Sequence, residues 1–343
     1  MPLTAVLMND TRGHYHFGCH RVMRAIESNL ERRGVRITAR SLVRNDWLVD
    51  RAFLKAVAAC DIIVINGEGT LHHGSRHGEK LLQIVNHPAR GAKPVALINA
   101  IYQENPSEWR RFLEGVEIIS PRDSWSAAAL KEATGRDIVH VPDLSMAEGF
   151  HPAADSLPRN LLTIGESVLG ATSRDLISFS RANENARFLP IVGALKSSKP
   201  QHGPALRALR EVYIHAHSSV FRLQNRRAIF SKNEFEYVDH LLRSYLHVSG
   251  RFHAICFALT TKTPFLALTS NAWKIEALVD DMGIDKSRIV DVSALTGLVA
   301  GSQSLAFGVE EEARITRAMA AGVAGASRLF DQIVEVAQTR KAA

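Results

Sequence analysis

Arg251 and His253 stand at the start of a predicted helix, directly after a buried strand that ends at Gly250. Lys274 has the same position relative to the next predicted strand, which ends at Thr269. An arginine can bind an anion through two hydrogen bonds, a lysine supplies a point charge, and a histidine can transfer a proton near neutral pH. Because neighbouring parallel strands end at one edge of a sheet, where helix N-termini also attract anions, the pattern predicts an anion site.

A carboxylate flanked by glycines follows another buried run, in "VINGEGTLHHGSRHGEK". The strand is predicted to end at Asn66, and Gly67 and Gly69 then permit a tight turn with close backbone approach to a ligand. Glu68 between them is hard to explain by packing, so it is either solvated or placed for proton transfer. Further cleft candidates near predicted strand ends are Asn9, Thr70, His72 and Asn271.

The loop "NDTRGHYHFGCH" (9–20) also follows a predicted strand, and a glycine near its end opens a helix. The free backbone N–H groups and the helix dipole at such a loop favour an anion, which Arg12, His14, His16 and His20 would then meet. The other interpretation is a surface loop with solvated histidines. The glycine spacing does not match a dinucleotide fingerprint.

Arg122 lies where the predicted strand "EIIS" (117–120) leads into a helix. An arginine at this place can bind a carboxylate or phosphate of a ligand through two hydrogen bonds. The alternative is a structural salt bridge to Asp123 or Asp143.

Metal binding is not predicted. His73 and His77 would share a face if their segment were helical, but no HExxH or carboxylate pattern accompanies them. The three cysteines lie far apart, without metal-type spacing, and their odd number argues against a disulfide framework.

Short β-branched runs alternate with helical patterns along the whole chain, which predicts parallel sheets covered on both faces. The predicted strands are 4–9, 35–43, 61–66, 94–102, 117–120, 138–142, 161–167, 187–193, 228–231, 245–250, 264–269 and 287–292. The predicted helices are 19–33, 125–134, 203–217, 233–244, 252–260, 272–281 and 308–338.

The polar segment 146–160, which contains two prolines, separates two α/β halves. We therefore predict an α/β fold of two Rossmann-like, doubly wound parallel-sheet domains that face a central cleft. The expected units are an N-terminal domain over 1–150, a C-terminal domain over 151–305 and a terminal helix within 306–343 that packs back on the first domain.

Composition is that of a folded protein with a sizeable core: 343 residues, 46% apolar and 22% charged. No apolar run reaches the ~18–20 residues of a membrane span, and "MPLTAVLMND" is too short for a signal peptide, so we expect a cytoplasmic protein. The net charge is +7, but the basic residues do not alternate with aromatic residues, which argues against nucleic-acid binding. Anionic small substrates, anionic polysaccharide and peripheral attraction to the inner membrane face remain open, as does the oligomeric state.

The sequence resembles the polysaccharide pyruvyltransferase family. The resemblance rests on "DIIVINGEGTL" (61–71), "ISPRDSWSAAALKEATG" (119–135), "VHVPDLS" (139–145), "SGRFHAICFALTTKTPFLAL" (249–268) and "NAWKIEALVDDMGI" (271–284). It implies a GT-B-like fold and transfer of a pyruvyl group from phosphoenolpyruvate to a sugar of a surface polysaccharide or its lipid-linked precursor. It implies no cofactor. Where the family usually has a run of glycines, this chain has Gly67-Glu68-Gly69.

The resemblance also assigns roles. By matching motif, it places Arg251 and His253 at the donor site, with Arg122 and Lys274 assisting on the anion. The chemistry of the donor then favours Arg251 and Lys274 for its phosphate and carboxylate, with Arg122 third, and His253 as the proton donor. Glu68 or His16 would accept the proton of the sugar hydroxyl, from the acceptor side of the cleft.

Two other functions stay open. A GT-B glycosyltransferase would use a nucleotide-activated sugar, again with Glu68 or His16 as base. A non-catalytic carbohydrate-binding protein would use the same cleft without chemistry, which the density of ionisable residues at strand ends disfavours.

Overall fold

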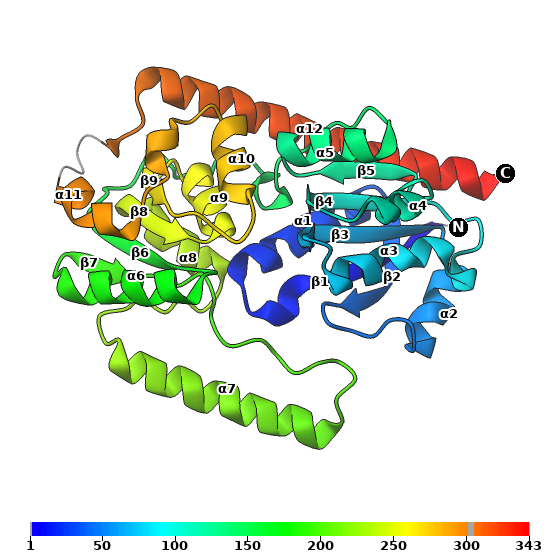
Figure 1. Cartoon of the computed structure of the whole chain (residues 1–343), viewed down its shortest axis with the longest axis horizontal. Coiled ribbons are helices and arrows are strands. Elements are labelled where there is room, and N and C mark those ends of the chain that lie inside the picture. The colour runs from blue at the N-terminus through cyan, green and yellow to red at the C-terminus, as the bar shows by residue number, and fades with distance from the viewer. Residues whose placement is uncertain (1, 301–304, 343) are drawn as a thin grey trace.

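The computed structural model describes residues 2–300 and 305–342. Its first half is built on a five-stranded sheet in the order β2-β1-β3-β4-β5, in which every neighbouring pair is parallel (Figure 1). The strands are β1 (Leu3–Asp10), β2 (Val35–Leu42), β3 (Ile62–His72), β4 (Val95–Gln103) and β5 (Ile118–Pro121).

Both faces of this sheet are covered, because side chains of a strand alternate between its two faces. In β3, Ile63 and Ile65 join the apolar cluster on one face, and Ile62 and Val64 join the cluster on the other. The first face packs against α2 (Arg51–Ala59), α3 (Arg76–Leu82), α4 (Arg110–Leu113) and α5 (Ser124–Thr134). The second packs against α1 (Phe17–Arg32) and α12 (Val309–Ala342).

The second half contains a four-stranded parallel sheet in the order β7-β6-β8-β9. Its strands are β6 (Leu161–Ser167), β7 (Ala186–Phe188), β8 (Ser244–Gly250) and β9 (Phe265–Ala267). Helices α6 (Gly170–Ala182) and α11 (Leu295–Ala300) cover one face, and α8 (Glu234–Leu242), α9 (Phe252–Thr260) and α10 (Lys274–Asp281) cover the other. Helix α7 (Pro204–Gln224) runs along the outside of both halves (Figure 1).

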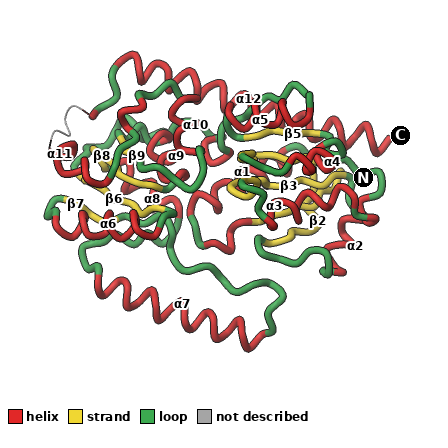
Figure 2. Tube along the Cα trace, in the orientation of Figure 1, coloured by secondary structure: helices red, strands yellow, loops and turns green. Residues whose placement is uncertain are grey.

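Two helices connect the halves. The long α12 contributes Ile315 and Met319 to the core around α9 and α10, and farther on Phe330 and Ile333 to the core of the first sheet. At the other side of the molecule, Phe17 at the start of α1 packs on Tyr237 of α8, with ring centroids 5.8 Å apart. Figure 2 shows the two groups of strands surrounded by helices.

The predicted fold class, two doubly wound parallel-sheet units, is confirmed. Three predicted strands are wrong: the segments 138–142, 228–231 and 287–292 form no strand. Val139 is 77% exposed, Ile229 makes one backbone bond to Phe188, and Ile289 makes one bridge to Ala267. The predicted strand 187–193 stops at Phe188, since Pro190 has no N–H to continue the ladder.

The predicted end of the third strand at Asn66 is also wrong. β3 continues to His72 and keeps pairing with β4 on both sides of a register shift between Glu68 and Leu71. Glu68 sits in this irregularity with φ +36°, in the left-handed region. A Cβ on Gly67 would overlap Ala100 of β4, so a glycine is needed there for close strand contact and not for a turn.

The packing of α12 on the first sheet can be measured. Phe330 is fully buried, so Phe330→Ala should lower the free energy of unfolding by ~3–5 kcal/mol through lost burial and the remaining cavity. Val309 on the same helix is 87% exposed, and Val309→Ala should change the free energy of unfolding by less than ~0.5 kcal/mol. Equal urea midpoints for the two variants would contradict this role of α12.

Candidate active site

The predicted residues meet at the points where each sheet reverses its strand order. In the first sheet β1 lies between β2 and β3, and in the second β6 lies between β7 and β8. Parallel α/β sheets bind ligands in the crevice at such a switch point. A cavity of about 170 Å³ lies between the two switch points. Its polar lining is Thr11, His14, His16, Cys19, Glu68, Thr70, Arg122, Arg251, His253, Ser270 and Lys274.

Glu68 is held in place by three donors across the first switch point. Its Oε2 accepts hydrogen bonds from Thr11 Oγ1 at 2.6 Å and Asn66 Nδ2 at 3.1 Å, and its Oε1 accepts one from Cys19 Sγ at 2.9 Å. The residue is buried and lines the cavity. The carboxylate is thus oriented by the protein and faces the ligand space, as a proton acceptor requires.

His253 lies between two carboxylates of the first half, although it belongs to α9 of the second. Its Nε2 is 3.9 Å from Glu68 Oε1 and 3.6 Å from Asp143 Oδ2. Among the described residues this buried nitrogen has no hydrogen-bond partner. Asp143 is fully buried, yet the imidazole and Arg122 hold the pKa of its carboxyl well below the usual range against the opposing effect of burial. His253 is therefore placed to exchange a proton with a ligand.

Three cations surround the cavity. Arg122 contacts Asp143 at 3.4 Å and lies 4.1 Å from the ring centroid of Phe252, while Arg251 Nε is 3.6 Å from Glu166 across the second switch point. Burial, with Arg122 and Arg251 nearby, lowers the pKa of Lys274 to about 7. In the described part of the chain, buried guanidinium nitrogens of both arginines lack hydrogen-bond partners, so they can bind an anion.

His16 has a different environment from the other candidate base. Its Nδ1 accepts the Gly18 N–H at 3.1 Å and caps α1, so in the neutral ring the proton is on Nε2. Burial, with His253 nearby, lowers its pKa well below the usual value, which keeps the ring neutral. Burial and Lys196 lower the pKa of His14 to about 4. These histidines therefore add hydrogen-bonding groups and no charge.

The side chains of His16, Cys19 and His253 place three potential metal ligand atoms within 4.8 Å of one another. A metal would require the thiolate, but burial and the Glu68 carboxylate raise the pKa of the Cys19 thiol well above its usual value. The thiol instead donates to Glu68. The protonated thiol therefore does not favour a metal centre at these three residues.

Comparison with known proteins identifies the family of the chain. A family model described as "Polysaccharide pyruvyl transferase" matches residues 16–271. The chain belongs to the polysaccharide pyruvyl transferase family. Membership of this family makes the protein a transferase. No curated protein matches the sequence.

Solved structures with TM-scores above 0.5 share the fold of this member of the family. A UDP-GlcNAc 2-epimerase from Neisseria meningitidis aligns over 97% of this chain and 99% of its own, with 11% identity and a TM-score of 0.52. A functionally uncharacterised protein from Klebsiella pneumoniae aligns over 84% and 92%, with 11% identity and a TM-score of 0.51. An alpha-glucosyltransferase solved with UDP and DNA aligns over 98% and 99%, with 10% identity and a TM-score of 0.49. The predicted GT-B-like architecture is confirmed.

The other predicted cleft residues of this family member differ in their relation to the cavity. Asn9 donates to the Asn66 carbonyl and to Thr70, and Asn271 accepts a 2.7 Å hydrogen bond from Lys274. Gly69 lines the cavity. His72 lies outside it, against His73. The positioning role of these residues depends on side-chain bonds between strands, which sequence spacing does not reveal.

Two arrangements that the sequence left open are not formed. His73 and His77 share no helix face, since α3 begins at Arg76 and His73 lies in a turn with φ +52°. The Nε2 atom of His77 instead lies 3.2 Å from Asn9 Oδ1. Arg12 is not available to an anion in the cavity, because it pairs with Asp10 and Glu27.

Sequence reasoning missed residues that position others. Asp143 entered only as a salt-bridge partner of Arg122, and Glu166 and Cys19 were given no role in the site. Glu166 is buried, accepts the N–H groups of Ile191 and Val192, and orients Arg251. The position of Glu166 at the carboxyl end of the predicted strand 161–167 is the one sequence feature that could have indicated its place in the site.

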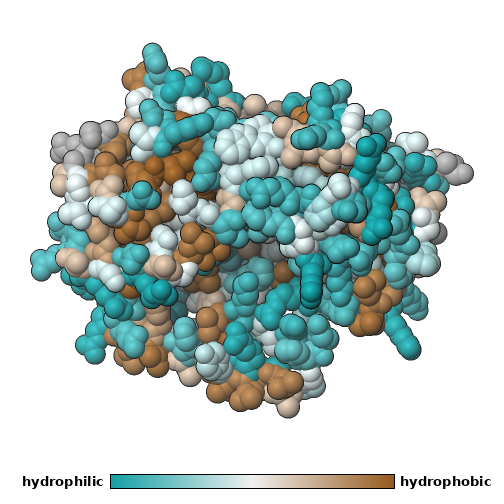
Figure 3. Space-filling view, viewed as in Figure 1, coloured by the Kyte–Doolittle hydropathy of each residue, from teal (hydrophilic) through white to brown (hydrophobic). Residues whose placement is uncertain are grey.

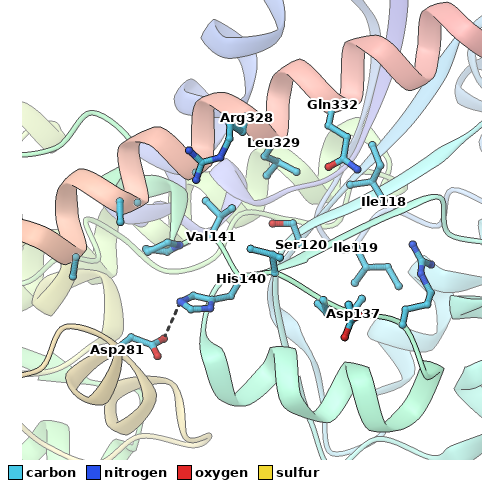
Figure 4. Close-up of a pocket in the computed structure, with 18 of the residues that line it drawn as sticks. Ile118, Ile119, Ser120, Asp137, His140, Val141, Asp281, Arg328, Leu329 and Gln332 are labelled. Atoms are coloured by element: carbon cyan, nitrogen blue, oxygen red, sulfur yellow. Dashed lines mark ion pairs between the residues drawn. The ribbon is translucent and has the colours of Figure 1, made fainter.

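A larger cavity of about 580 Å³ lies elsewhere, between α12, β5 and the segment 136–142 (Figure 4). His140 and Asp281 face each other at 3.8 Å on one side of it, and Arg328 of α12 lies on another. It is away from both switch points. Volume alone therefore does not identify the active site.

The contact of α1 with His253 leads to a test. Gly18 packs so closely on the His253 ring that a Cβ there would overlap it, whereas a Cβ on Gly69 would meet nothing within 4 Å. Gly18→Ala should lower the free energy of unfolding by ~1–3 kcal/mol through overpacking, and Gly69→Ala should be neutral. Chemical denaturation measures both. A neutral Gly18→Ala would mean that the two halves are not in contact at His253.

Proposed function

We propose that the protein transfers a pyruvyl group from phosphoenolpyruvate to hydroxyls of a sugar in a surface polysaccharide or its precursor. The observation that carries this proposal is the pairing, in one small cavity, of an oriented carboxylate at Glu68 with His253 and a group of three cations. Family membership supports the same reaction.

The donor has a phosphate and a carboxylate, and the cavity offers matching charges. Arg251 and Arg122 can each bind an oxyanion through two hydrogen bonds, and Lys274 adds a point charge. The volume of about 170 Å³ is below the ~300–1,000 Å³ typical of pockets for drug-sized ligands, which favours a small donor.

The chemistry delivers one proton to carbon and removes two from the sugar hydroxyls, and the remaining proton leaves with the phosphate. His253 delivers a proton to the CH₂ carbon of the donor, while a sugar oxygen bonds to the neighbouring carbon. Phosphate then leaves that carbon, and a second sugar hydroxyl bonds there to complete the ketal, so that phosphoenolpyruvate and a diol give a ketal and inorganic phosphate. The three cations stabilise the departing phosphate.

Glu68 is the better candidate for the base. Its carboxylate lines the cavity and accepts hydrogen bonds through both oxygens. His16 uses its basic Nδ1 for the Gly18 N–H, so that nitrogen is not available to a sugar hydroxyl. A base in this position typically contributes ~10²–10⁴-fold in rate.

A second candidate is a glycosyltransferase with a nucleotide sugar as donor. The observation in its favour is an adjoining cavity of about 200 Å³, lined by Phe188, Phe221 and Phe230, which shares Arg251 with the first. Aromatic walls could stack on a nucleobase. Thermal-shift measurements with phosphoenolpyruvate and with nucleotide sugars separate the two, since a ligand at 100 times its Kd adds ~2.7 kcal/mol of stability.

The direct test incubates the protein with phosphoenolpyruvate and glycan acceptors, and measures phosphate release and the mass of the product. Glu68→Gln should lower kcat by ~10²–10⁴-fold while donor binding changes little, because the acceptor base is lost and the cations remain. Glu104→Gln, at an exposed carboxylate outside the cavity, is the matched control and should be fully active. Turnover of a nucleotide sugar without pyruvyl transfer would reject the proposal.

Donor binding should depend on the charge of Lys274. With a pKa of about 7, the amine is protonated below pH 7 and helps to bind the anion, and it loses this charge as the pH rises. The affinity of the wild-type protein for phosphoenolpyruvate should therefore fall by up to about tenfold per pH unit above 7. The Lys274→Met variant should bind phosphoenolpyruvate weakly, and its affinity should depend less on pH.

Isothermal titration between pH 6 and pH 9 measures both proteins. The ionisation of the donor itself is common to the two, so the difference between their profiles isolates Lys274. Parallel profiles would contradict a role for its charge.

A further inference from the structure

The outer face of α7 is apolar and exposed. Leu206, Leu209, Val212, Val220 and Leu223 are each between 53% and 67% exposed. With 3.6 residues per turn, they fall within an arc of about 120° on one side of the helix. Figure 3 shows apolar side chains along the lower edge of this view, where α7 lies.

The opposite face of the helix already has its partners. Ile214 is 3% exposed, and Phe221 packs between Phe188 and Phe230, with ring centroids 6.2 and 6.0 Å away. Tyr15 of the first half donates to Glu211 at 3.4 Å. The exposed stripe is therefore a second apolar face and not the side by which α7 attaches to the protein.

The charge around this stripe has one sign. Lysines and arginines recur throughout residues 193–231, where Glu211 is the single acid in the sequence. Lys199, just before the helix, and Arg226, just after it, are exposed. Arg210 lies beside the stripe, with its guanidinium 5.3 Å from the ring centroid of Tyr213. An apolar stripe with basic flanks is typical of a helix that lies in the plane of an anionic membrane surface.

The helix has the character of a surface helix and not of a membrane span. Within residues 2–300 and 305–342, no helix is long and apolar enough to cross a bilayer. An interfacial helix inserts its apolar side chains at the boundary of headgroups and acyl chains and keeps its basic side chains among the headgroups.

We propose that the outer face of α7 docks the protein on an anionic lipid surface. The charge decides between the possible occupants, because a second copy of the chain would bring two basic segments 193–231 together, whereas anionic headgroups neutralise them. The apolar side chains then enter the lipid, and basic side chains of the segment, such as Arg210, bind the headgroups.

Docking through α7 would bring the lipid surface toward the mouth of the cavity. The segment that leads into α7 crosses to the first half, where Ser197 N and Oγ donate to the Gly13 carbonyl at 3.1 and 2.9 Å. Arg44 donates to the Ser197 carbonyl at 2.9 Å. His14, next to Gly13, lines the cavity. If the proposed pyruvyl transfer holds, on which this step rests, the acceptor is a sugar carried on a lipid.

Vesicle sedimentation of the full chain tests the docking face. The protein should sediment with vesicles of phosphatidylcholine and phosphatidylglycerol, less with phosphatidylcholine alone, and be released by high salt. Leu209→Ser/Leu223→Ser should lose most of this binding. Val49→Ser/Val309→Ser is the matched control, since these residues are 70% and 87% exposed elsewhere, and should bind as the wild type. Arg210→Gln and Arg226→Gln should each weaken binding about fivefold, the equivalent of ~1 kcal/mol per basic residue.

Equal sedimentation with both kinds of vesicle, or equal binding by the two double variants, would overturn the proposal. A wild-type dimer in light scattering that Leu209→Ser/Leu223→Ser makes monomeric, without vesicle binding, would overturn it in favour of a second copy. Thermal melting confirms that each variant is folded. Turnover of a water-soluble acceptor, measured in parallel, separates failure of docking from failure of the proposed transfer.

Discussion

The burial of opposite charges between the two halves is the constraint on which the rest of the structure depends. Taking an ion out of water costs several kcal/mol, and partners must compensate for it. Here the carboxylates belong to both halves and so do the cations, and His253 contacts two carboxylates across the boundary. The charged groups involved are Glu68, Asp143, Glu166, Arg122, Arg251 and Lys274. The incomplete pairing of the arginines leaves capacity for an anionic ligand.

The two switch points explain why these charges meet. Thr11 bonds Glu68 between β1 and β3 of one sheet, and Arg251 pairs with Glu166 between β8 and β6 of the other. At its switch point, where the helices leave toward opposite faces of the sheet, each sheet thus contributes a charged group that can still form hydrogen bonds with a ligand. Helix α12 and the start of α1 hold the two halves together, so the site exists only in the assembled pair.

The carboxylate of Glu68 is oriented by residues that follow β1. Glu68 stands in an irregularity of β3, and the strand pairing with β4 continues around it. Thr11, directly after β1, and Cys19 of α1 donate hydrogen bonds to its carboxylate. This carboxylate and the cations Arg122, Arg251 and Lys274 line one cavity, so both signs of charge are available to a ligand there.

The sequence by itself determined the parallel two-sheet fold, most helices and the cationic side of the site. Those features follow from local periodicity and from the rule that parallel strands end at one edge. It did not separate true strands from apolar segments such as 138–142, because strand formation depends on a neighbour with free hydrogen-bonding groups. Tertiary structure alone decided that β3 passes through Glu68, that Asp143 and Glu166 position His253 and Arg251, and that α7 presents a second apolar face. Each of these depends on contacts between residues distant in the chain, which spacing along it does not encode.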